Sequence, residues 1–204
     1  MRSVRPLAHR TEEPLELQAK ALDQLRYIRR TIEDAGSFTS VPGWGQVVIG
    51  LTALLAAWIA ARQRTETAWL VTWLVESALA LTISAWSMAR KARAAGLPLF
   101  SGPARKFALS FSLPLAAGAV LTWVFQSRGI VAVLPGMWLL MFGTAVATGG
   151  AFSVSIVPVM GFCFMVLGAA AFLSPAAWGN LWMALGFGLV MIGFGLLIAR
   201  RHGG

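Results

Sequence analysis

Six long runs of apolar residues, separated by short polar segments, make up most of this 204-residue chain. The runs cover residues 43–61, 68–89, 107–126, 130–148, 152–173 and 178–199. A helix needs about 20 mostly apolar residues to cross the hydrocarbon layer of a bilayer. Backbone amides find no water there, so helices are the expected form of every run. The pattern predicts an all-α, integral membrane six-helix bundle over residues 41–204.

Residues 1–40 have a polar pattern and are expected to form an arm on the cytoplasmic side of the membrane. Within this arm, residues 11–35 predict an amphipathic helix with Thr11 as its N-cap. Apolar residues recur on one face of that helix at Leu17, Ala21, Leu25, Ile28 and Ile32. We expect this face to lie on the lipid surface, on the protein's own loops, or against a protein partner or a second copy.

The distribution of Lys and Arg predicts the orientation of the bundle. Fourteen of them fall in the arm, in residues 90–106 and in the C-terminal tail, whereas Arg62, Arg64 and Arg128 fall on the opposite side. Basic residues concentrate in cytoplasmic segments, so both termini are expected in the cytoplasm.

Glycine and proline residues predict where helices stop or bend. The segment 90–106 is expected to be a loop, because it contains Gly96, Pro98, Gly102 and Pro103. Three further prolines lie in or near the predicted spans and are expected to kink them: Pro114, Pro135 and Pro158.

The amino-acid composition is that of a membrane protein, and the net positive charge is interpreted accordingly. The chain is 57% hydrophobic and 12% charged, about half the charged fraction of a soluble domain. The formal net charge is +9, but the basic residues flank the apolar runs and do not line one exposed face. This placement favours contact with lipid head groups and argues against nucleic-acid binding.

Glu76 is the one ionisable residue inside any predicted span. It shares a small, polar helix face with Thr72 and Ser84, and such a face is expected to point into the bundle. A charged carboxylate is costly in hydrocarbon. Glu76 is therefore expected to be protonated, to face water or to bind a cation, with Gln46, Thr52 and Asn180 as candidate partners from other spans.

The last span carries two copies of Gly-Phe-Gly, seven residues apart. Seven residues are about two helical turns, so Gly186 and Gly193 are expected to share one face, and Gly188 and Gly195 another. Small residues allow close approach of helices in lipid, which predicts that this span packs between two neighbours.

The chain lacks a recognisable catalytic constellation. Both histidines, His9 and His202, lie near the termini, and no predicted span contains Asp. No catalytic residue, metal site or cofactor is expected. Two functions remain open: a non-enzymatic interaction or regulatory component that uses the arm, and a small transporter or channel subunit that uses Glu76 as a proton or cation site.

The stretch from Tyr27 to Gly45, YIRRTIEDAGSFTSVPGWG, resembles the start of small multi-pass bacterial membrane proteins. The ending IARRHGG, from Ile198 to Gly204, is similar to theirs. The resemblance implies a bacterial inner-membrane protein, and it implies no activity and no functional residues.

Overall fold

The structure, a computed structural model, describes residues 20, 22–28, 42–94, 102–151 and 153–202. The chain divides into two units, Met1–Ser37 and Phe38–Gly204. In the first unit, residues 22–28 are helical and exposed, and Arg26 pairs with Asp23 at 3.2 Å. The rest of the predicted helix over 11–35, apart from residue 20, lies outside the described residues.

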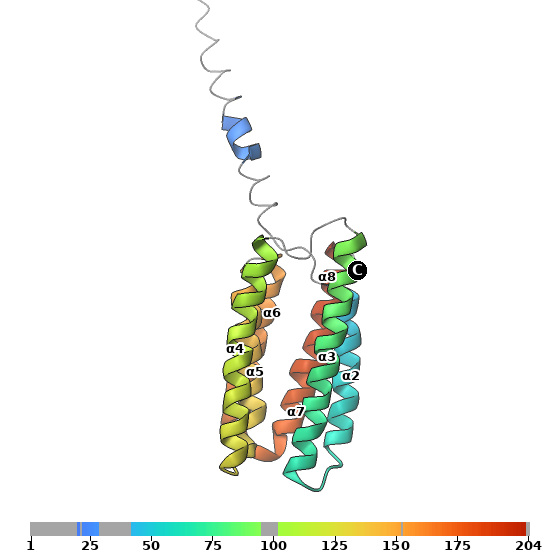
Figure 1. The fold of residues 1–204 in the computed structure, drawn as a ribbon, viewed down its shortest axis with the longest axis vertical. Helices are drawn as coiled ribbons and strands as arrows, with labels where there is room; N and C mark the ends of the chain where they lie inside the picture. The colour runs from blue at the N-terminus through green and yellow to red at the C-terminus, as the bar shows by residue number, and fades with distance from the viewer. Residues whose placement is uncertain (1–19, 21, 29–41, 95–101, 152, 203–204) are drawn as a thin grey trace, which may run out of the picture. The chain divides into compact units, whose positions relative to one another are not determined.

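The described part of the second unit is built from helices that run side by side (Figure 1). Six of them are long and apolar enough to cross a membrane. The first five are α2 (Gly43–Ala60), α3 (Glu66–Ala94), α4 (Gly102–Ser127), α5 (Leu134–Gly150) and α6 (Ile156–Leu173). The sixth consists of α7 (Gly179–Met183), the π-helix η3 (Ala184–Val190) and α8 (Met191–His202). Two short 3₁₀ turns, η1 (Val131–Val133) and η2 (Ala176–Trp178), precede α5 and α7.

These helices form two groups of three. The helix α2 packs against α3 and α8, and α5 packs against α4 and α6 (Figure 1). The groups meet mainly where α7 and η3 lie against α5 and α6. The sixth span therefore lies between α2 on one side and the α4–α6 group on the other.

The prediction of a loop over 90–106 is wrong at both ends. The helix α3 continues to Ala94, and α4 begins at Gly102. Residues 90–94 are Arg, Lys and Ala, which favour helix. Pro103 is the second residue of α4, where a helix does not use the missing N–H. Residues 95–101 lie outside the described part of the chain.

The three prolines in or near the spans occupy two kinds of position. Pro135 lies in the first turn of α5, and Pro158 is the third residue of α6. Neither removes an intrahelical hydrogen bond there, so the expected kinks at these two positions have no cause. Pro114 lies inside α4, where it removes one backbone donor.

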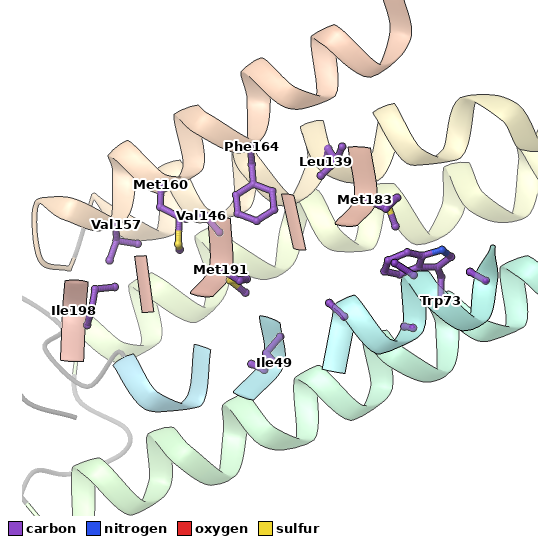
Figure 2. Close-up of a cluster of buried hydrophobic side chains, with 14 of the residues drawn as sticks. Ile49, Trp73, Leu139, Val146, Val157, Met160, Phe164, Met183, Met191 and Ile198 are labelled. Carbon is purple, nitrogen blue, oxygen red and sulfur yellow. The ribbon is translucent and has the colours of Figure 1, made fainter. Parts of the chain in front are cut away.

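A buried cluster of apolar side chains joins the two groups, and ten of its members are labelled in Figure 2. Phe164 is fully buried and lies next to Phe187 of η3, with ring centroids 5.3 Å apart. Phe187 also meets Phe142 of α5 at 5.1 Å and Trp73 of α3 at 6.4 Å. Trp69 of α3 stacks on Trp138 of α5 with centroids 5.7 Å apart. Aromatic contacts of this kind add to the packing energy that holds the groups together.

The four glycines of the sixth span do not all serve close packing. A Cβ on Gly188 would meet Leu54 of α2, and one on Gly195 would lie 2.9 Å from the carbonyl oxygen of Gly43. A Cβ on Gly186 would meet Leu139 and Phe164, from α5 and α6.

Gly193 is exposed, and no atom of the residues that the structure describes lies within 4 Å of a Cβ built on it. The prediction that Gly186 and Gly193 share a packing face is therefore wrong. Gly186 meets side chains of α5 and α6, whereas no described residue of a neighbouring helix reaches Gly193. Gly188 and Gly195, which are also seven residues apart, do share the face toward α2.

Candidate functional site

Glu76 lies within α3 and is buried, with 8% of its surface exposed. The Oγ1 atom of Thr52, on the neighbouring α2, lies 2.8 Å from Glu76 Oε1, within hydrogen-bond distance. Thr52 is 24 residues away in sequence, so the contact depends on how α2 packs against α3. Of the three candidate partners named from the sequence, Thr52 is the one that the structure brings to Glu76.

The Thr52 hydroxyl has two neighbours and one proton. Its oxygen lies 2.9 Å from the carbonyl oxygen of Ile49 and 2.8 Å from Glu76 Oε1. A hydroxyl donates one hydrogen bond and accepts others. If Glu76 is ionised, Thr52 donates to one of the two oxygens at a time. If Glu76 carries a proton, the carboxyl donates to Thr52, Thr52 donates to Ile49, and both bonds form together.

The other polar residues on this face of α3 do not bind Glu76. The hydroxyl of Thr72 donates to the carbonyl oxygen of Ala68 at 2.8 Å. Ser84 is half-buried two turns further along α3, and no hydrogen bond between it and Glu76 is found in the described residues. Ser87 continues the face and lies against α2, since a Cβ on Gly45 would be 2.7 Å from its Oγ. The face is turned toward α2, as expected for polar groups in lipid.

Gln46 and Asn180 lie at other levels of α2 and α7. The amide nitrogen of Asn180 donates to the carbonyl oxygen of Ala57 at 2.7 Å, which ties α7 to α2. The oxygens of both amides, Gln46 Oε1 and Asn180 Oδ1, are buried without a hydrogen-bond partner among the described residues. The indole nitrogen of Trp73, one turn before Glu76, is also buried without a hydrogen-bond partner among the described residues. The α2–α3–α7 region therefore holds several polar groups in addition to Glu76.

Two hydrogen bonds of tryptophan were not predicted from the sequence. The indole N–H of Trp138 donates to Thr122 at 2.7 Å, and that of Trp182 donates to Ser174 at 2.6 Å. The first joins α5 to α4. The count of nine tryptophans is a signal in the sequence, but their partners depend on the packing of the helices.

A small cavity of about 180 Å³ lies where α5 begins and α6 ends. It is lined mostly by apolar side chains and backbone, including Pro135, Phe172 and Pro175. This cavity is separate from the Glu76–Thr52 pair, because neither residue lines it. In the part of the chain that the structure describes, no group of three His, Cys, Asp or Glu side chains is placed to hold a metal ion.

Comparison with known proteins adds no template for this site. No protein-family model matches the chain, and neither the curated proteins nor the solved structures show a match.

Proposed function

We propose that this protein is a non-enzymatic component of the bacterial inner membrane that binds another protein, or a second copy of itself, through its N-terminal helix. The observation that carries the proposal is the exposure of Leu25 and Ile28, which are 62% and 51% exposed. Both belong to the apolar face expected for residues 11–35. The ion pair of Asp23 with Arg26 lies elsewhere on the same helical turns. An exposed apolar face beside charged residues is the form of a helix that binds a groove or another helix.

The orientation that we propose has both termini in the cytoplasm. It is supported by the excess of Lys and Arg on that side, 14 against three. With this orientation the N-terminal helix is available to cytoplasmic proteins and to the cytoplasmic ends of other membrane proteins.

Site-specific photo-crosslinking in living cells tests the proposal. A photoreactive amino acid is placed at Leu25 or Ile28 of the full-length chain, and at Asp23 or Arg26 as matched controls on the polar side. We expect one reproducible protein adduct from positions 25 and 28, which mass spectrometry identifies as a partner or as a second copy. An adduct of equal yield from positions 23 and 26, or no protein adduct from any of the four, would contradict the proposal.

A second candidate function is a small transporter or channel subunit in which Glu76 binds a proton or a cation. The observation that favours it is the Thr52–Glu76 contact between two membrane-spanning helices. Intramembrane acids are commonly functional, and a carboxyl with a hydroxyl partner can bind and release a proton. The test is a proton or cation flux in liposomes that Glu76→Gln abolishes while the protein stays folded. A flux that is the same in the variant and in the parent would reject this function.

A further inference from the structure

One end of the membrane unit collects basic side chains from three helices. The chain order places the end of α3, the start of α4 and the end of α8 at this end, as Figure 1 shows. The basic residues there are Arg90, Lys91, Arg93, Arg105, Lys106, Arg200 and Arg201. We call this set the basic end.

Buried apolar residues hold the helices at the basic end in place. Ala92 is 2% exposed, Ala104 is 9% exposed, and Ile198 is fully buried. Ala104 and Ile198 belong to the same core cluster. The arginines beside these residues, such as Arg93, Arg105 and Arg200, are exposed. Each of these helix ends thus has a buried apolar residue beside exposed arginines.

The two acidic residues of the second unit lie away from the basic end. Within residues 38–204 the acids are Glu66 and Glu76. Glu66 begins α3 at its other end, and Glu76 is bonded to Thr52 far from Arg90 along the helix. Seven like charges gathered far from both of these acids create a positive field at this end that attracts anions.

Exposed apolar side chains continue down the helices from the basic end. Trp86 is 63% exposed one turn before Arg90, whose guanidinium carbon lies 5.6 Å from the centre of its ring. On α4, Leu109 and Leu113 are exposed after Lys106. The surface therefore presents charge at the helix ends and apolar area next to it. A free anion uses the charge alone, whereas a phospholipid uses both parts.

We infer that the basic end binds the head groups of anionic phospholipids, with their acyl chains along the apolar sides of α3 and α4. Each Lys or Arg near an anionic surface contributes about a fivefold factor in affinity, and the attraction is screened by salt. This site does not depend on the N-terminal helix or on Glu76, so it stands apart from the proposed functions.

Lipid binding to the full-length protein in detergent tests the inference. The protein is compared in micelles with added phosphatidylglycerol, in micelles with added phosphatidylcholine, and in lipid-free micelles with inorganic phosphate. Thermal unfolding measures stability, and native mass spectrometry measures the lipid that stays bound. We expect phosphatidylglycerol to raise the melting temperature and to remain bound, with a smaller effect at high salt. Equal stabilisation by phosphatidylcholine would overturn the inference. Stabilisation by inorganic phosphate alone would assign the basic end to a soluble anion instead.

Matched charge-removal variants locate the binding. Arg90→Gln combined with Arg93→Gln should weaken phosphatidylglycerol binding about 25-fold, the product of two fivefold factors. Arg200→Gln combined with Arg201→Gln should act in the same direction. Arg62→Gln combined with Arg64→Gln, at the opposite end of the bundle, is the control and should bind like the parent. All three variants should melt like the parent in phosphatidylcholine. An equal loss in the control pair would contradict a site at the basic end.

Discussion

Thr52 on α2 and Glu76 on α3 are hydrogen-bonded across a helix interface, with 2.8 Å between Oγ1 and Oε1. Both side chains come from helices that are long and apolar enough to span a membrane. In the hydrocarbon layer no water is present to replace a lost hydrogen-bond partner. The pair therefore contributes to the stability of the α2–α3 contact whether or not Glu76 has a further role.

Replacing Thr52 by valine should destabilise the protein. Valine keeps the shape of the side chain but removes the hydroxyl, which leaves the buried carboxyl of Glu76 without this partner. The expected loss in free energy of unfolding is about 1–3 kcal/mol, measured by denaturant titration in detergent micelles. Thr52→Ser retains a hydroxyl and is the control. If Thr52→Ser loses as much stability as Thr52→Val, the hydrogen bond is not the cause of the loss.

Substitutions of Glu76 should separate hydrogen bonding from charge. Glu76→Gln keeps the shape and a hydrogen-bonding group, so its stability should stay within about 0.5 kcal/mol of the parent. Glu76→Leu leaves Thr52 with an apolar neighbour and should lower the free energy of unfolding by about 1–3 kcal/mol. The same titration in micelles measures both variants. If glutamine destabilises as strongly as leucine, a charge or a bound cation holds this site.

Two glycines of α8 that lie two residues apart should differ in how far a bulky side chain lowers the melting temperature. Gly195→Leu places a side chain against the backbone of α2, at the carbonyl of Gly43 and the amide of Val47, each 2.9 Å from the new Cβ. Overpacking of this kind costs about 1–3 kcal/mol or more and should lower the melting temperature. Gly193→Leu points into open space and should melt within a few degrees of the parent. Equal losses in the two variants would contradict the packing of α8 on α2.

The aromatic cluster offers a matched pair on α6. Phe164 is fully buried against Phe142 and Phe187, whereas Phe162 is 66% exposed. Phe164→Ala should cost about 3–5 kcal/mol through the cavity that it leaves, and Phe162→Ala should cost much less. Thermal unfolding in detergent compares the two. If both variants melt alike, the contact between the two helix groups does not depend on Phe164.

The orientation can be tested by cysteine labelling in intact cells. In a Cys163→Ala background, Gln63→Cys should react with a membrane-impermeant thiol reagent, because the segment between α2 and α3 is proposed to face outward. Ala94→Cys, exposed at the other end of α3, should react only after the cells are permeabilised. The reverse pattern would place both termini outside the cytoplasm.

Much of the architecture was predictable from the order of residues. Six apolar runs predicted six helices, and the structure has six helices that are long and apolar enough to span a membrane. The prediction succeeds because lipid leaves the backbone few alternatives to helix. Helix ends were less predictable: α3 and α4 extend past the predicted spans with polar, helix-favouring residues such as Lys91, which hydropathy does not count.

The candidate site was predictable in part. Glu76 stood out as the one acid in an apolar run, and its face toward the bundle followed from helical periodicity. Its partner did not, because Gln46, Thr52 and Asn180 were equally suitable by type, and the register of α2 against α3 brings Thr52 alone to Glu76. That register depends on contacts far apart in sequence, such as Gly45 against Ser87.

The clearest failure was at Gly193, and it shows what tertiary structure decides. The repeat of Gly-Phe-Gly predicted equal roles for Gly186 and Gly193 if the helix were α throughout. In the structure Gly186 packs on Leu139 of α5, while Gly193 faces away from the described residues of every neighbouring helix. The sequence by itself determined that these residues lie in a helix long and apolar enough to span a membrane, because the length of an apolar run is a local property. Which neighbour each one meets depends on helix register and turn geometry, which are set by the packing of all six spans together.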